Sequence, residues 1–269
     1  MKLGIISDIH FNGDMNIRGK LRRDLLACIG FWERNGADFV IQLGDLIDGE
    51  GAQAKENLAE ALAIFRTASL PVLHVPGNHC LAVPLKEYLC RARLCSPYYA
   101  FRHAGVRFIV LHGMDINPAS RPTLEADRQR QDLAGRDRWA NGYCGAIGQN
   151  QLRWLERQLD SASESAEPVV LFCHFPLLKE TTDEAHGLLW NHEEVTGLLC
   201  RRCNILACFN GHYHHSAHAL RSGIHYISLP AFRNRLEPPF RTCGMIEIGK
   251  SQLRVTDMNT DLLHELTIP

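Results

Sequence analysis

Apolar segments of two kinds alternate along the first third of the chain. Residues 3–7 and 38–43 are mostly apolar runs of strand length, whereas the apolar residues between Leu21 and Trp32 recur at helical spacing. A second helix is expected at about 52–67, and a third strand begins at Pro71. This strand–helix–strand–helix–strand order predicts a parallel or mostly parallel sheet whose crossovers are the helices.

The rest of the chain continues with short strands and two further helices. Strands are expected at about 98–101, 106–111, 169–173 and 205–209, and helices at about 149–159 and 188–200. Short strands at 225–229, 245–249 and 253–258 look antiparallel. Because no internal repeat or low-complexity tract interrupts the chain, we expect residues 1–269 to form a single domain.

One long segment, residues 114–147, has no clean hydrophobic period. A loop of this length inside a compact domain is usually functional or mobile, so we interpret it as an irregular insertion near the active site that covers the substrate. Its arginines are balanced by acidic residues, which predicts a solvated, self-paired face. These arginines are Arg121, Arg128, Arg130, Arg136 and Arg138.

The composition is that of an ordinary globular protein. The formal net charge of the 269 residues is −1, which gives no reason to expect a nucleic acid or an anionic membrane as partner. The first residues do not form an export signal, and no apolar stretch reaches the length of a membrane span. We therefore expect a cytoplasmic protein; the sequence gives no indication of its oligomeric state.

The ten cysteines do not form a clear metal or disulfide pattern. Cys200 and Cys203 make one C-x-x-C pair, but Cys90 and Cys95 do not supply a convincing second one. Without an export signal, reduced thiols are the default.

Candidate chemistry is concentrated in five fragments, each of which follows an apolar strand. They are Asp8–His10, Gly44–Asp45, Gly77–His79, His174 and Gly211–His214. Each alone is a weak signal, because such residues are common in surface loops, turns and hydrogen-bonded cores. Together they occupy the same topological position, since ligands bind beyond the carboxyl ends of strands in sheets of this kind.

The residue types in these fragments suit a pair of divalent metal ions. Two Asp, one Asn and four His offer oxygen and imidazole nitrogen without a thiolate, a set that favours Mn²⁺, Fe²⁺ or Zn²⁺ over Ca²⁺. They are enough for two ions that share a carboxylate and a water, and the glycines let the backbone turn sharply beside them.

In their order and spacing the five fragments resemble the calcineurin-like metallophosphoesterases. The family pattern is D-x-H, GD, GNH-[DE], a lone H and GH-x-H, and this chain reads SDIH, LGDLID, PGNHC, FCHFP and NGHYHH. The resemblance implies an α/β (α+β) fold, a two-sheet β-sandwich of mixed strands flanked by helices. It also implies hydrolysis of phosphate ester or anhydride bonds by a hydroxide that bridges two metals.

The resemblance carries roles over to individual residues. It implies that Asp8, His10 and His214 bind one metal, that Asn78, His174 and His212 bind the other, and that Asp45 bridges them. His79 would be the catalytic residue, a general acid or electrostatic stabiliser beside the phosphoryl group. One position departs from the pattern, because Cys80 stands where the family has Asp or Glu; a thiol orients a neighbouring His poorly, so another residue is expected to orient His79.

A more local resemblance concerns the substrate. The segment Asn141–Leu155 and the Leu189–Asn191 tripeptide are similar to the manganese-dependent ADP-ribose/CDP-alcohol diphosphatases. This implies Mn²⁺ as the metal, with Fe²⁺ or Zn²⁺ open, and a small nucleotide-derived phosphate as the substrate. That subgroup tends to carry Gln where His10 stands, which leaves metal preference and substrate open.

Four further residues have both a functional and a structural interpretation. Trp190 either stacks on a base or packs a helix, and Asn191 either bonds a phosphate or a ligand-bearing loop, or caps a helix. Arg233 and Arg235 either hold a second phosphate or terminal anionic group, or belong to a solvated loop.

Three alternative functions are considered beside the diphosphatase. A cyclic or linear phosphodiesterase shares all five core motifs. A non-catalytic binding scaffold predicts erosion at the ligand positions, yet each of them carries a competent ligand type. A phosphoprotein phosphatase is less favoured, because little chain remains to build an extended groove.

Overall fold

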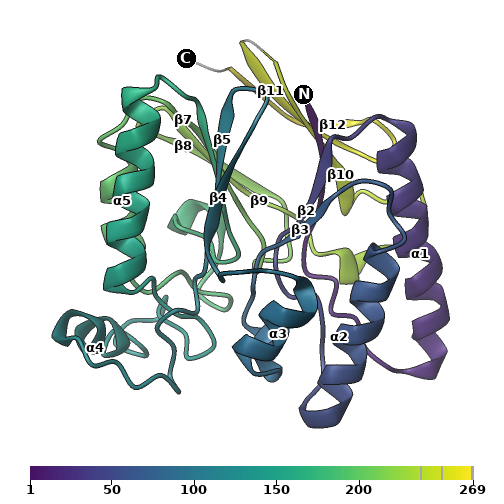
Figure 1. Cartoon of the computed structure of the whole chain (residues 1–269), viewed down its shortest axis with the longest axis horizontal. Coiled ribbons are helices and arrows are strands. Elements are labelled where there is room, and N and C mark those ends of the chain that lie inside the picture. Colours follow the sequence, from purple (N-terminus) through teal and green to yellow (C-terminus); the bar gives the residue numbers. More distant parts are fainter. Residues whose placement is uncertain (237, 250, 268–269) are drawn as a thin grey trace. The chain divides into compact units, whose positions relative to one another are not determined.

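The computed structural model describes residues 1–236, 238–249 and 251–267 and divides the chain into two compact units. Unit 1 consists of Met1–Ser96 and Pro230–Pro269, and unit 2 of Pro97–Leu229. Each unit contains one six-stranded mixed sheet with helices (Figure 1). These two mixed sheets confirm the predicted fold class, while the single domain stays a prediction.

The sheet of unit 1 has the strand order β12-β11-β10-β1-β2-β3. The strands are β1 (Lys2–Ile6), β2 (Phe39–Gln42), β3 (Val72–His74), β10 (Cys243–Ile248), β11 (Gln252–Asp257) and β12 (Leu262–Thr267). The first three pair in parallel, as predicted, with Leu3 opposite Phe39 and Val40 opposite Val72. Strands β10 and β11 are antiparallel to their neighbours, also as predicted. Strand β12 has no predicted counterpart.

The helices of unit 1 are α1 (Met15–Arg34), α2 (Gly51–Phe65) and α3 (Leu85–Ala92), with short 3-10 turns η1 (His79–Ala82) and η3 (Phe232–Asn234). The apolar faces of α1 and α2 supply Leu25, Trp32 and Leu58 to the core. Trp32 Nε1 donates to the Gly244 carbonyl at 2.8 Å. At Gly4 an added Cβ would lie 2.7 Å from the Trp32 ring, so β1 can approach this indole only without a side chain.

The sheet of unit 2 has the order β4-β5-β6-β7-β9-β8. Its strands are β4 (Tyr99–His103), β5 (Val106–Leu111), β6 (Val169–Cys173), β7 (Ile205–Asn210), β8 (Ala217–Arg221) and β9 (Ile224–Ser228). The antiparallel prediction for 225–229 is wrong on one side: β9 is antiparallel to β8 but parallel to β7. The reason is that β8, which the sequence pattern missed, forms a hairpin with β9 and takes the edge position.

The helices of unit 2 are α4 (Glu125–Gln131), α5 (Gln149–Glu164) and α6 (His192–Leu199), with the turn η2 (Lys179–Thr181). The helix predicted from 188 begins four residues later. Backbone amides just before it are used elsewhere, because Leu188 N donates to the Trp139 carbonyl and Trp190 N donates to the Gly145 carbonyl. Within the described part of the chain, no helix is long and apolar enough to cross a membrane.

The 114–147 segment is more ordered than its sequence suggested. Paired backbone hydrogen bonds between Ile116 and Ala146 close its base, and α4 lies within it. The prediction of a solvated face is wrong for Arg130, which is buried and pairs with Asp127 at 2.7 Å and Glu194 at 2.6 Å. The exposed Arg128 and Arg136 do pair with Glu125 and Asp132 of the same segment, as predicted, whereas the exposed Arg138 pairs with Glu184 outside it.

Candidate active site

In unit 1, the predicted site residues follow the carboxyl ends of β1, β2 and β3. Asp8 and His10 follow β1, Asp45 follows β2, and Asn78 and His79 follow β3. The backbone φ angles of Asp8, His10 and Asp45 are 50°, 48° and 46°, in the left-handed region that non-glycine residues seldom adopt. Such a conformation costs of order 1–3 kcal/mol and persists where the surrounding structure enforces it, typically at functional sites.

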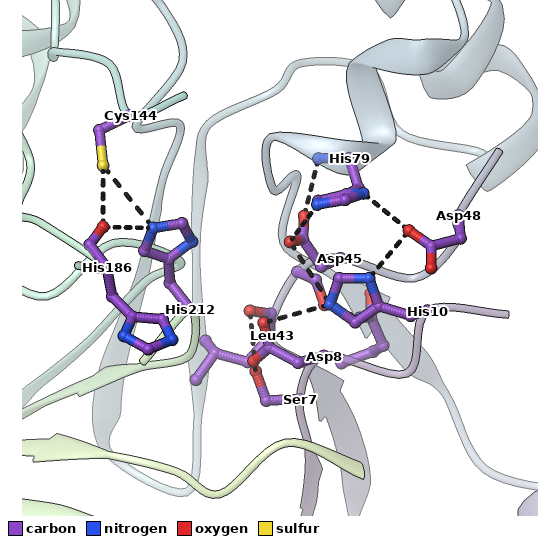
Figure 2. Close-up of polar contacts among 12 residues, drawn as sticks. Ser7, Asp8, His10, Leu43, Asp45, Asp48, His79, Cys144, His186 and His212 are labelled. Atoms are coloured by element: carbon purple, nitrogen blue, oxygen red, sulfur yellow. Dashed lines mark hydrogen bonds and ion pairs between the residues drawn. The ribbon is translucent and has the colours of Figure 1, made fainter. Parts of the chain in front are cut away.

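These side chains form a buried cluster of potential metal donors. Asp8 and Asp45 are almost fully buried, and His10 Nε2 lies 3.9 Å from Asp8 Oδ1 and 3.8 Å from Asp45 Oδ2. The distances are too long for hydrogen bonds but suit donor atoms that share an ion at bonds of about 2.1 Å. Ser7 Oγ donates to the Asp8 carboxylate and helps to fix it (Figure 2). The donors therefore fit a divalent metal.

Asp48 is a site residue that the sequence analysis missed, although it lies in the quoted LGDLID fragment. Its Oδ1 accepts from His10 Nδ1 at 3.1 Å and from His79 Nδ1 at 2.8 Å (Figure 2). Burial would raise the pKa of Asp48, but the hydrogen bonds and charges of the two histidines hold that pKa well below its usual value. Because the Asp48 carboxylate accepts a hydrogen bond from Nδ1 of each histidine, each imidazole directs its Nε2 toward the other potential metal ligands.

His79 is the exposed member of the unit 1 cluster. Its side chain is 42% exposed, and its ring meets that of His10 edge-on with centroids 4.6 Å apart. The backbone N of His79 donates to Asp45 Oδ1 at 2.9 Å. Gly77 permits this approach, because a Cβ there would lie 2.3 Å from the same carboxylate oxygen. Asn78, which lies between Gly77 and His79 in the chain, is partly buried at the start of η1.

Cys80 does not replace the usual acidic residue as an anion. Burial and the nearby Asp45 charge raise the pKa of its thiol to about 11, so the thiol remains protonated at neutral pH. The orienting contact that the sequence analysis expected from another residue is made by Asp48.

In unit 2, the three predicted histidines also follow strand ends. His174 comes after β6 and is fully buried, and His212 and His214 come after β7 with φ angles of 63° and 62°. The rings of His174 and His212 lie 5.2 Å apart. The Asn210 amide holds the two strand ends together by donating to the Cys173 and Phe175 carbonyls.

The tautomer of His212 follows from one hydrogen bond. Its Nε2 lies 2.9 Å from the carbonyl oxygen of His186, which can only accept, so Nε2 carries the proton and Nδ1 is left as the metal-binding nitrogen (Figure 2). The buried Cys144 thiol lies 3.6 Å from the same Nε2. His186 and Cys144 are further residues of this site that the sequence analysis did not identify.

Trp190 and Asn191 are both buried and hydrogen-bonded to the 141–147 segment. Trp190 Nε1 donates to the Asn141 carbonyl at 2.9 Å. Asn191 stands at the N-cap position of α6 without a capping bond from its side chain. Instead its Oδ1 accepts a hydrogen bond from Ile147 N at 3.0 Å, and its Nδ2 donates one to Ile147 O at 2.9 Å. For Trp190, these contacts favour the structural interpretation. For Asn191, they favour the interpretation in which the side chain bonds a loop over the one in which it caps a helix.

Arg233 and Arg235 have different environments. Arg235 is committed to an ion pair with Asp24 at 2.7 Å and lies over the Phe232 ring. Arg233 has an exposed side chain, and its backbone N donates to the Asp8 carbonyl at 3.0 Å. The segment thus holds the backbone of Arg233 next to a predicted ligand and uses the Arg235 side chain as an anchor.

The sequence has relatives that cover most of its length. Residues 1–216 match the calcineurin-like phosphoesterase family. The chain is 31% identical to a manganese-dependent ADP-ribose/CDP-alcohol diphosphatase of Oryza sativa subsp. japonica, over 85% of this chain and 79% of that protein. It is 28% identical to a protein of the same name from Arabidopsis thaliana, over 85% of each chain.

Solved structures share the fold. A dimetal phosphatase from Danio rerio superposes with a TM-score of 0.82 at 22% identity, over 100% of this chain and 98% of that one. The purple acid phosphatase PPD1 from yellow lupin gives a TM-score of 0.60 at 12% identity, over 99% of this chain and 53% of that one.

Proposed function

Because the chain belongs to the calcineurin-like phosphoesterase family, we propose that it hydrolyses the diphosphate linkage of nucleoside diphosphate conjugates of the ADP-ribose or CDP-alcohol type. The observation that carries this choice is the similarity to diphosphatases along 85% of this chain and 79–85% of the relatives. Similarity confined to the five motifs would favour any member of the family equally.

The metal ligands are proposed from the family pattern and the geometry of each unit. Asp8, His10 and His214 would hold one divalent ion, Asn78, His174 and His212 the other, and Asp45 both. When bound, two such ions polarise phosphoryl oxygens and make a water molecule a competent nucleophile at neutral pH. Mn²⁺ is the proposed metal, because the curated relatives carry manganese in their names; Fe²⁺ and Zn²⁺ suit the same donors.

His79 is the proposed catalytic residue, with Asp48 as its positioning residue. The Asp48 carboxylate fixes the ring through Nδ1, so Nε2 is directed to present a proton to the leaving oxygen or to stabilise charge on the phosphoryl group. The exposure of His79 fits this role, since the substrate must reach it.

Substrate contacts are proposed for Arg233, whose exposed guanidinium would hold a second phosphate or a terminal anionic group. Arg235 would act by anchoring this segment through Asp24. Trp190 and Asn191 would act on the substrate site indirectly, by holding residues 141–147 in place.

The test is an assay of the purified protein, stripped of metal and reloaded with Mn²⁺. The panel contains bis-p-nitrophenyl phosphate, p-nitrophenyl phosphate, cyclic AMP, ADP-ribose, CDP-choline and CDP-glycerol, with Asp45→Asn as the inactive control. We expect metal-dependent release of AMP or CMP from the diphosphates. Activity only on cyclic AMP or the diester would instead establish a phosphodiesterase, and no activity with any divalent metal would revive the scaffold hypothesis.

The proposed setting is the cytoplasm, with small nucleotide-derived molecules as partners. None of the ten cysteines, which all lie in the described part of the chain, forms a disulfide, and Cys90, Cys95, Cys200 and Cys203 are exposed. Thiols in such numbers suit a reducing compartment. Cell fractionation that finds the protein in an oxidising compartment would contradict this assignment.

A further inference from the structure

Unit 2 contains an Asp–His pair in which, as in Asp48–His79, a carboxylate oxygen accepts a hydrogen bond from Nδ1 of the imidazole. Asp183 Oδ1 accepts from the backbone N of His186 at 2.9 Å and from His186 Nδ1 at 2.8 Å. The two bonds fix both the turn and the ring. His186 Nε2 lies on the opposite side of the ring, away from the carboxylate, and the side chain is 30% exposed. An imidazole held in this way is pre-organised to contact something outside the turn.

The His186 ring packs on the loop that carries two predicted metal ligands. Its centroid lies 5.7 Å from that of His214, 6.4 Å from that of His212 and 5.4 Å from that of Tyr213 (Figure 2 shows the rings of His186 and His212). The family pattern assigns His212 and His214 to different ions, so His186 lies beside ligands of both.

His186 itself does not belong to any group of three potential ligands within the described residues. It therefore stands beside the predicted ligands rather than among them. The rings around it are those of His212, Tyr213, His214 and the exposed His215, so hydrogen-bonding groups surround it. This environment suits an anion more than an apolar group.

The side chain and the carbonyl of His186 have separate roles. The carbonyl accepts from His212 Nε2, and any residue at position 186 can supply it. The imidazole with its Asp183 clamp is not needed for that contact. The proposed mechanism thus gives no function to the His186 imidazole, which is partly exposed, fixed by Asp183 and adjacent to two predicted ligands.

We propose that His186 hydrogen-bonds the second phosphoryl group of a diphosphate substrate, the one that is not attacked, and that Asp183 is its positioning residue. This inference rests on the proposed diphosphatase function. The two phosphoryl groups share one bridging oxygen, so we expect a group bound at the metals to bring its neighbour close to the ring cluster of His186, Tyr213 and His215. The pair would then distinguish diphosphates from substrates with one phosphate.

The test is calorimetric binding to the Mn²⁺-loaded protein, which needs no turnover. The ligands are α,β-methylene-ADP, a diphosphate whose P–C–P bridge resists hydrolysis, and AMP, which has one phosphate; free Mn²⁺ is held constant. His186→Ala should weaken binding of α,β-methylene-ADP about 10- to 100-fold, the range of one hydrogen bond to a charged group, and that of AMP less than about threefold. His103→Ala, a partly buried histidine at the end of β4, is the matched control and should change neither affinity.

A double-mutant cycle isolates the role of Asp183. Asp183→Ala should weaken binding of α,β-methylene-ADP about 3- to 10-fold alone and less than about twofold in the His186→Ala background, where only its bond to the backbone N of position 186 remains to be lost. Metal content is measured for every variant.

Equal losses for both ligands, or loss of metal in His186→Ala, would mean that the side chain only supports His212 and would overturn the proposal. So would unchanged affinities, or a wild type that binds the two ligands equally. These outcomes are independent of the hydrolysis panel, by which the diphosphatase function itself stands or falls.

Discussion

Substitution of Asp48 is the most direct test of the proposed mechanism. One carboxylate oxygen accepts from both His10 and His79, so a single substitution changes a predicted ligand and the proposed catalytic residue together. Asp48→Asn keeps the shape but removes the charge, and Asp48→Ala removes the acceptor of both hydrogen bonds. Asp38→Asn, at an exposed carboxylate that accepts from the Lys2 backbone, is the matched control.

The expected magnitude follows from these two bonds. A hydrogen bond to a charged group contributes about 1.5–3 kcal/mol, and loss of a group that orients a metal ligand typically lowers affinity or activity about 10- to 100-fold. A misoriented general acid loses about 100-fold or more. We therefore expect Asp48→Ala to lower kcat about 100-fold or more and Asp48→Asn about 10-fold, both with weaker Mn²⁺ binding, and Asp38→Asn to match the wild type.

The assay is hydrolysis of the best substrate in the panel over a range of Mn²⁺ concentrations, with metal content measured in parallel. Saturating Mn²⁺ should restore the metal occupancy of Asp48→Ala but not its kcat, because the His79 contact remains lost. Full recovery of kcat at high Mn²⁺ would show that Asp48 serves only His10. Activity within twofold of the wild type at all concentrations would refute the reasoning about both histidines.

Four further predictions concern other parts of the molecule. Gly77→Ala should lower activity about 100-fold, since its Cβ would lie 2.3 Å from Asp45 Oδ1 and force the ligand to move; wild-type kinetics would contradict the close approach. Burial lowers the pKa of His74 to about 4, so stability is complete above about pH 6.5 and is lost as the pH falls toward 4 because the unfolded chain binds the proton first. The wild type should lose about 2 kcal/mol from this group between pH 8 and 5, and His74→Gln should reduce the difference between urea denaturations at these two pH values. EDTA should lower the Tm, because an ion present at about 1,000 times its Kd stabilises the fold by about 4 kcal/mol; an unchanged Tm would count against a metal centre. Asn191→Ala should cost about 2–3 kcal/mol in urea denaturation, as both bonds to Ile147 are lost and the buried backbone groups stay unpaired.

Much of the candidate site could be proposed from the sequence, because its signals are local. A strand of 3–6 residues followed by a fixed short motif is visible in the linear pattern, and parallel strands place their ends at one edge. The ends of β1, β2, β3, β6 and β7 indeed carry the seven predicted ligands. The left-handed backbone of Asp8, His10 and Asp45 is not visible in this way, since no glycine marks these positions.

The sequence could not show which residues far apart in the chain contact each other, or which way the side chains of its motifs point. Asp48 was within a quoted motif, yet only the fold shows that it faces both His10 and His79 rather than solvent. The difference between Arg233 and Arg235 depends on Asp24, more than two hundred residues away along the chain.

The sequence by itself determined which residue types stand at the strand ends, and therefore the chemistry of the site, because strand periodicity and short motifs are local properties of the chain. Only the tertiary structure decided which nitrogen of each imidazole is held, by Asp48 at His10 and His79, and by the His186 carbonyl at His212. Hydrogen bonds between segments far apart in sequence depend on how the chain packs, and that packing fixes the direction in which each ligand points.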